Sequence, residues 1–249
     1  MQYGICDLSI VPVRKDPADS SEMVTQLLYG EYFKILEERG KWSRIRIAFD
    51  SCEGWISNSQ VSKIEEISYE NLCNIPRVYS ADIIEFISEE NGNLTTIPLG
   101  SVLSHSGGSN FKFEGQTTTG IKSKDKLIET AFLYLNAPYM WGGKTPFGID
   151  CSGFTQMVYM LNGYNLHRTS FQQARQGEPL SFIEESEPGD LAFFDDAEGN
   201  IIHVGIMMQD NYIIHVHGKV RIDRIDHSGI YNTDIKKHTH QLRVIKKII

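Results

Sequence analysis

The sequence predicts an α+β protein in which an all-β N-terminal part precedes a mixed C-terminal part. Residues 1–66 hold short apolar stretches separated by polar turns, and Ser43–Ile47 alternates with the period of two that is typical of a half-buried strand. From Ser123 onward apolar residues recur at helical spacing, and strand patterns return after Pro188. Short strands at close spacing in the first part indicate a small barrel.

Residues 67–120 show weaker patterns. We expect strands over Ile83–Ile87 and Leu94–Val102, because Asn91-Gly92 between them is a hairpin-type turn signal. The Gly-, Ser- and Thr-rich stretch Ser104–Gly120 indicates a loop or linker. The predicted division of the chain is therefore 1–66, 67–120 and 121–249.

The last part should contain helices followed by strands. Apolar spacing predicts a helix over Leu127–Leu135, and a second helix starts at Cys151 with Asp150 as its N-cap. A short third helix should begin at Ser170, where Gln173 would complete a capping box. The expected strands are Leu191–Phe194, Ile201–Met208, Tyr212–Val216 and Leu242–Ile249.

Composition disfavours several classes of function. The 249-residue chain has a formal net charge of -8 and no Lys/Arg run, which argues against binding nucleic acid or an anionic membrane. None of the four cysteines lies in a C-x-x-C pair, so the cysteines predict neither a zinc site nor a disulfide framework. With no visible secretory signal, we expect a cytoplasmic protein unless a leader was removed.

Cys151 is the candidate nucleophile. It opens a predicted helix, where the dipole and free backbone N–H groups favour a thiolate over a thiol. Such activation is what a nucleophilic cysteine needs. The alternative is a buried structural cysteine.

His203 is the candidate base. It lies on the strand face opposite to Ile202 and Val204. If residues 209–211 form a three-residue hairpin loop, His203 and His215 emerge on one face as diagonal neighbours, and His217 shares that face. The residues alone do not choose between His215 and His217, and each histidine also fits a polar strand face.

At this point the residues resemble the NlpC/P60 peptidases. The catalytic-cysteine motif of that family resembles Tyr139–Gly143 followed by Gly148–Gly153. Further matching stretches follow in the same order: His167-Arg168-Thr169-Ser170, Pro188-Gly189-Asp190-Leu191, His203-Val204-Gly205 and Ile214-His215. In the N-terminal part, Val11–Arg14 and Glu53–Ile56 resemble a bacterial SH3 (SH3b) domain, and the middle part resembles a degenerate second copy.

The resemblance implies a papain-like α+β catalytic domain preceded by small SH3b-like barrels. It implies that Cys151 is the nucleophile, His203 the base and His215 the residue that orients His203. The combination is similar to γ-D-glutamyl-L-diamino acid endopeptidases, which release L-Ala-γ-D-Glu from murein peptides with a free N-terminal L-Ala. No metal or organic cofactor is implied.

The resemblance also suggests residues that contact the substrate. Thr169 stands where the family often has Asp. The implied contacts are Glu53, Tyr79, Asp150, Ser152, Thr169 and Ser170.

Partners and rival functions complete the expectation. The partner is a murein peptide, with no nucleic acid or membrane, and the chain is expected to be a monomer. Whether the diamino acid is meso-diaminopimelate or L-Lys stays open. Two rivals remain: a hydrolase or amidase that acts on intact peptidoglycan, and a non-catalytic wall-binding protein.

Overall fold

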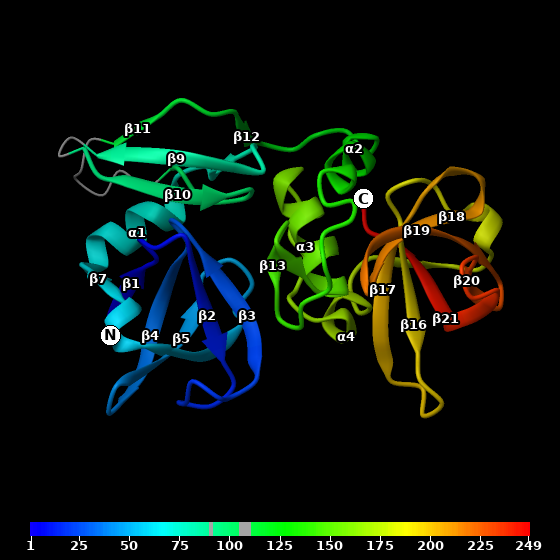
Figure 1. Cartoon of the computed structure of the whole chain (residues 1–249), viewed down its shortest axis with the longest axis horizontal. Helices are drawn as coiled ribbons and strands as arrows, with labels where there is room; N and C mark the ends of the chain where they lie inside the picture. The colour runs from blue at the N-terminus through cyan, green and yellow to red at the C-terminus, as the bar shows by residue number, and fades with distance from the viewer. Residues whose placement is uncertain (90–91, 105–110) are drawn as a thin grey trace. The chain divides into compact units, whose positions relative to one another are not determined.

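The computed structural model describes residues 1–89, 92–104 and 111–249 (Figure 1). The chain divides into two compact units. The first unit comprises Met1–Gly120 together with Trp141–Pro146, and the second comprises Ile121–Met140 and Phe147–Ile249. None of the helices found in the described residues is long and apolar enough to span a membrane.

The first unit is built on an antiparallel sheet with the strand order β3-β2-β6-β5-β4-β1-β7. Alternate residues of the predicted strand Ser43–Ile47 are buried, because Ile45 and Ile47 face the core while Arg44 and Arg46 face solvent. The predicted SH3-like β region is therefore confirmed. Its strands are β1 (Gln2–Ile5), β2 (Ile10–Arg14), β3 (Met23–Leu28), β4 (Tyr32–Arg39), β5 (Trp42–Ile47), β6 (Glu53–Ser57) and β7 (Ser62–Ile64).

The rest of the first unit holds smaller elements. A 3-10 turn (Asn58–Gln60) connects β6 to β7, and helix α1 (Glu66–Asn74) and strand β8 (Val78–Ser80) follow β7. Strand β13 (Lys144–Thr145) lies in the segment Trp141–Pro146, which returns to this unit. Strand β8 pairs with β12, and β9 lies between β10 and β11. The bounds of these strands are β9 (Ile84–Glu89), β10 (Leu94–Pro98), β11 (Phe111–Phe113) and β12 (Thr117–Thr119).

Two expectations for the middle part need correction. The strand expected over Leu94–Val102 ends at Pro98, and Gly100 then turns with a positive φ of 86°. The expected loop Ser104–Gly120 contains strands β11 and β12, whose short ladders the Ser/Thr-rich sequence does not reveal. Asn91 of the expected turn and residues 105–110 of the expected loop lie outside the described residues.

The second unit is built around a sheet with the order β15-β21-β16-β17-β18-β19-β20. Strand β20 also pairs with β21, so six of these strands close on themselves as a barrel. The mixed α+β content agrees with the predicted fold class. The strands are β14 (Gly148–Ile149), β15 (Glu178–Leu180), β16 (Leu191–Asp195), β17 (Ile201–Met207), β18 (Tyr212–His217), β19 (Lys219–Asp226), β20 (Gly229–Asn232) and β21 (Lys237–Lys247).

The helices of the second unit are α2 (Lys126–Phe132), α3 (Cys151–Leu161) and α4 (Ser170–Gln173), with 3-10 turns at Ile183–Glu185 and Gln209–Asn211. All residues of α3 after Cys151 are buried, so this helix is enclosed by the rest of its unit. Helix α2 stops three residues before the predicted end at Leu135. The predicted cap of α4 is also wrong by one residue, because Thr169 is the N-cap and its box partner is Gln172.

A buried ion pair holds the returning segment Trp141–Pro146 within the first unit. The Lys144 ammonium lies 2.8 Å from a Glu31 carboxylate oxygen, and both side chains are almost fully buried. The other Glu31 oxygen accepts a hydrogen bond from the backbone N–H of Leu28, and the Lys144 N–H donates to Gln26. A buried charge is tolerated only when it is paired in this way.

We expect Lys144→Met to destabilise the protein by about 3–5 kcal/mol, because it leaves the Glu31 carboxylate buried without its counter-charge. Urea unfolding measures the change. Lys63→Met is the matched control, because Lys63 pairs with Glu38 on the surface of the same unit and should cost less than about 1 kcal/mol. Equal losses for the two variants would contradict the assignment.

Candidate active site

The candidate nucleophile sits at the start of α3, as predicted. Asp150 is the N-cap, and its carboxylate accepts a hydrogen bond of 2.6 Å from the backbone N–H of Gly153. The backbone N–H groups of Val204 and Ser152 also hydrogen-bond the Cys151 thiol. Val204 follows His203 in β17, so the thiol lies against the strand that carries the candidate base.

Arg168 holds the N-cap residue Asp150 in place. Its guanidinium donates to both Asp150 carboxylate oxygens at 3.0 and 2.7 Å, and to the Ser152 hydroxyl at 3.0 Å. Arg168 and Asp150 are both buried. The guanidinium therefore compensates the charge of a buried carboxylate.

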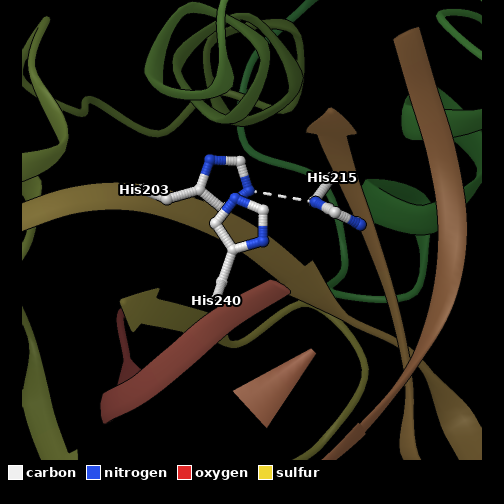
Figure 2. A group of neighbouring side chains, drawn as sticks. All are labelled: His203, His215 and His240. Carbon is white, nitrogen blue, oxygen red and sulfur yellow. Dashed lines mark hydrogen bonds between the residues drawn. The ribbon is translucent and has the colours of Figure 1, made fainter. Parts of the chain in front are cut away.

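The hairpin of β17 and β18 brings the two candidate histidines together. Gly205 pairs with His215, and the Met208 N–H donates to the Tyr212 carbonyl, which is the register that the three-residue loop predicted. His203 Nε2 lies 3.0 Å from His215 Nδ1 (Figure 2). His217 is exposed. The contact therefore forms with His215.

Gly205 makes this hairpin geometry possible. A Cβ atom at position 205 would lie 2.8 Å from the His215 Cβ and 2.7 Å from a side-chain carbon of Ile213. Those separations are too short for carbon atoms. The absence of a side chain at position 205 therefore lets the two strands approach closely enough for the histidine pair to form.

Asp223 on β19 extends the pair to a chain of three groups. Its carboxylate lies 3.0 Å from His215 Nε2, and the Arg221 guanidinium donates to both carboxylate oxygens. A carboxylate only accepts, so His215 Nε2 carries a proton and a neutral His215 accepts at Nδ1. His203 must then donate from Nε2, which leaves the lone pair of a neutral His203 on Nδ1. That nitrogen points away from His215 in Figure 2.

Burial keeps the histidines neutral. Desolvation and the neighbouring His215 hold the pKa of His203 well below its ordinary value of 6.5. Burial also lowers the pKa of His215, although Asp223 opposes that shift. Burial raises the pKa of Asp223, but the hydrogen bonds from His215 and Arg221 outweigh it and leave that pKa lowered.

Burial opposes the thiolate that was expected at Cys151. Burial, followed by the charge of Asp150, raises the pKa of the Cys151 thiol to about 12, and the hydrogen bonds from Val204 and Ser152 only partly oppose this. The sequence predicted a thiolate on the strength of the helix N-terminus. Desolvation of the sulfur opposes that dipole and favours the thiol, and the lowered pKa of His203 favours a neutral imidazole.

The remaining predicted site residues occupy two different units. In the second unit, Ser152 is buried against Asp150, and Thr169 and Ser170 form the start of α4. In the first unit, Tyr79 is buried, and Glu53 is partly exposed.

Glu53 is already paired. Each carboxylate oxygen of Glu53 forms an ion pair with an arginine, one with Arg44 at 2.7 Å and the other with Arg46 at 2.6 Å. The hydrogen bond from Arg46 is the largest cause of the lowered pKa of Glu53. Its part in substrate binding stays a prediction.

Two residues near the histidines were not found from the sequence. Asp223 lies opposite Ile213 in the β18–β19 ladder, diagonal to His215, and the tight turn at Gly218 was the available signal for that register. His240 on β21 stacks on His203, with ring centroids 4.1 Å apart and ring planes at 24°. His240 lies 37 residues beyond His203 in the sequence. The two rings come together because β21 and β17 both pair with β16, one on each side.

Comparisons with known proteins agree with this description. A family model described as the NlpC/P60 family matches residues 136–244, and one described as the bacterial dipeptidyl-peptidase Sh3 domain matches residues 13–61. A γ-D-glutamyl-L-lysine dipeptidyl-peptidase of Bacillus subtilis is 27% identical over 77% of this chain and 71% of its own length. Dipeptidyl-peptidase 6 of Lysinibacillus sphaericus is 25% identical over 88% of this chain and 91% of its own length.

A solved structure shows the same fold. The crystal structure of an NlpC/P60 family protein from Bacillus cereus matches with a TM-score of 0.82 and 20% sequence identity. The match covers 99% of each chain.

We expect His203 and His215 to be neutral at pH 6.5, each protonated on Nε2 alone, because burial depresses both pKa values. Long-range nitrogen–proton NMR spectra, recorded with EDTA and assigned with His203→Gln and His215→Gln, report each ring nitrogen. An exposed imidazole would be about half protonated at this pH. An imidazolium signal from His203 at pH 6.5 would instead indicate a thiolate–imidazolium pair.

Proposed function

Because the chain carries an NlpC/P60 peptidase domain and a bacterial dipeptidyl-peptidase SH3 domain, we propose that it cleaves murein peptides at the bond from D-Glu to the diamino acid. The proposed substrate has a free N-terminal L-Ala, and the product is L-Ala-γ-D-Glu. The reaction would serve the recycling of cell-wall peptides in the cytoplasm. The names of the two bacilli relatives support this substrate class.

One observation carries the proposal: a continuous hydrogen-bonded series from His203 through His215 to Asp223 lies beside a cysteine at a helix start. This is the arrangement in which a nucleophile meets a base that a third group orients. We assign Cys151 as the nucleophile, His203 as the base and His215 as the residue that fixes the tautomer of His203. Asp223 fixes the tautomer of His215 in turn.

The mechanism starts from neutral groups. As the Cys151 sulfur attacks the γ-carbonyl carbon of D-Glu, the thiol proton passes to Nδ1 of His203, and the charge moves to the carbonyl oxygen. Backbone N–H groups at the start of α3 stabilise this oxyanion, and one such donor is worth about 3–4 kcal/mol. His203 then protonates the amine of the departing diamino acid. A water molecule, deprotonated by His203, hydrolyses the thioester and regenerates the thiol.

The low pKa of His203 suits this cycle. A base must be unprotonated before it accepts the thiol proton. Burial lowers the pKa of His203, so its imidazole is neutral at pH 6.5. The imidazolium is a strong acid once formed, so it gives its proton readily to the leaving amine. The cost is a thiol with a high pKa, whose proton leaves only in concert with the attack.

Recognition of the free amine is the finer part of the proposal. An ammonium group favours a carboxylate, and Glu53 and Asp150 are the candidates, with Tyr79, Ser152, Thr169 and Ser170 as further contacts. Arg168 already holds both oxygens of Asp150, and Arg44 and Arg46 hold those of Glu53. A carboxylate accepts up to about four hydrogen bonds. Asp150 already accepts four, from Gly153, Ser152 and twice from Arg168, so Glu53 is the carboxylate with room for an ammonium.

Digestion of soluble peptides tests the substrate. We expect L-Ala-γ-D-Glu from L-Ala-γ-D-Glu-L-Lys-D-Ala or from its meso-diaminopimelate counterpart, measured by mass spectrometry. The N-acetylated peptide is the matched control and should react at least about 100-fold more slowly, because its charge is missing. Cleavage of intact sacculi with no cleavage of either soluble peptide would overturn the proposal, as would full activity of Cys151→Ala.

Asp223→Asn should lower kcat by about 10- to 100-fold with little change in KM, because the orientation of His215 is lost while the substrate contacts remain. Steady-state kinetics on the soluble peptide measure the effect. Asp234→Asn is the matched control, because Asp234 contacts the same Arg221 guanidinium from an exposed position. A kcat for Asp223→Asn equal to that of the control would remove Asp223 from the mechanism.

A further inference from the structure

His203, His215 and His240 form a cluster, and the proposed reaction gives no role to its third member, His240 (Figure 2). Each imidazole offers one ring nitrogen, and these nitrogens all lie within 4.8 Å of one another. The three rings come from β17, β18 and β21, which are three strands of the closed barrel. We propose that this cluster binds a zinc ion, and that the bound ion inhibits the enzyme reversibly.

The hydrogen bonds of His240 direct one nitrogen toward the ion. The Thr239 hydroxyl lies 3.4 Å from the Ile230 carbonyl and 2.9 Å from Nδ1 of His240. We take the hydroxyl to donate to the carbonyl, so that its oxygen accepts from Nδ1. A neutral His240 therefore has its lone pair on Nε2. The ring is only partly buried, and His240 also lines a surface pocket together with Thr239 and Gln241.

His215 is the second ligand, and its lone pair is already in place. Asp223 holds the proton of His215 on Nε2, which leaves Nδ1 free of a proton. A carboxylate behind a histidine is the partner that zinc-binding histidines ordinarily have, because it fixes the ring and raises the basicity of the ligand nitrogen. The Asp223–His215 pair therefore has the form of a zinc ligand with its supporting carboxylate.

His203 is the third ligand, and it must change tautomer. In the resting state its Nε2 proton is donated to His215. When Nε2 binds the ion, that proton moves to Nδ1, and the number of protons on the neutral ring is unchanged. Nδ1 is then occupied, so His203 can no longer accept the Cys151 proton. Inhibition follows from this tautomer alone and requires no bond from zinc to sulfur.

Zinc binding requires little movement of His203 and His215 but a rotation of the His240 ring. Tetrahedral zinc with Zn–N bonds of about 2.0–2.1 Å places its ligand nitrogens about 3.3–3.4 Å apart. The 3.0 Å separation between His203 Nε2 and His215 Nδ1 is close to this value. His240 moves most, by turning out of its stack on His203, and water fills the fourth position. Imidazole nitrogens favour zinc over magnesium or calcium.

Direct binding tests the site without relying on activity. Zinc chloride is titrated by calorimetry into Cys151→Ala, which lacks the thiol, and we expect one ion per chain. Adding His240→Phe, which keeps an aromatic ring in the stack, should weaken binding by more than about 10-fold. His238→Phe is the matched control, because His238 lies two residues away on β21 and pairs with Asp226. Circular dichroism checks that each variant is folded.

Several outcomes overturn the proposal. Unchanged affinity in His240→Phe excludes His240 as a ligand. Loss of binding in Cys151→Ala relative to the natural chain places the ion on sulfur. Cobalt(II) gives a second measurement, because a thiolate-to-cobalt charge-transfer band in the natural chain would also indicate a sulfur ligand.

Inhibition is measured separately and rests on the proposed function. Zinc should inhibit peptide cleavage, EDTA should restore it, and the inhibitory concentration should rise by more than about 10-fold in His240→Phe relative to that variant's own uninhibited rate. Binding without any peptidase activity on murein peptides would overturn the proposed function and leave the zinc site standing. Cleavage that zinc does not inhibit, at concentrations that fill the site, would overturn the inhibition.

Discussion

The hydrogen bond between His203 and His215 is the contact on which the chemistry of the site depends. It fixes which nitrogen of His203 holds a lone pair, and Asp223 determines its direction by holding the proton on the far side of His215. The bond forms only because the β17–β18 hairpin has one register and because Gly205 lets the strands approach. The register of the β17–β18 hairpin thereby determines the tautomer of His203.

The site is arranged around desolvation. The same burial that lowers the pKa of His203 raises that of Cys151, so it favours the uncharged form of both groups. A separated thiolate and imidazolium must be stabilised against this desolvation by the helix start and its backbone N–H groups. Asp150 and Arg168 form a buried charge pair next to the nucleophile and hold the geometry of the helix cap.

Local patterns predicted the parts of the site that neighbouring residues determine. The cap at Asp150, the start of α3 and the β17–β18 register all follow from short stretches of sequence, and the structure agrees with them. Contacts between distant strands could not be predicted in this way. Asp223 depends on the register of a second hairpin, and His240 reaches His203 because the distant strand β21 pairs with β16 beside β17. The desolvation of Cys151 could not be predicted for a related reason, since burial depends on the whole unit.

Residues Trp141–Pro146 belong to the first unit, although the chain on either side of them belongs to the second. The polypeptide therefore passes between the units three times, at residues 120–121, 140–141 and 146–147. A fragment that begins at residue 121 would keep Lys144 and lose Glu31. The Lys144 ammonium would then have no counter-charge and would have to be exposed to solvent. For anyone engineering this chain, the catalytic half is not a detachable module. The first unit supports the segment Trp141–Pro146, which ends four residues before Asp150.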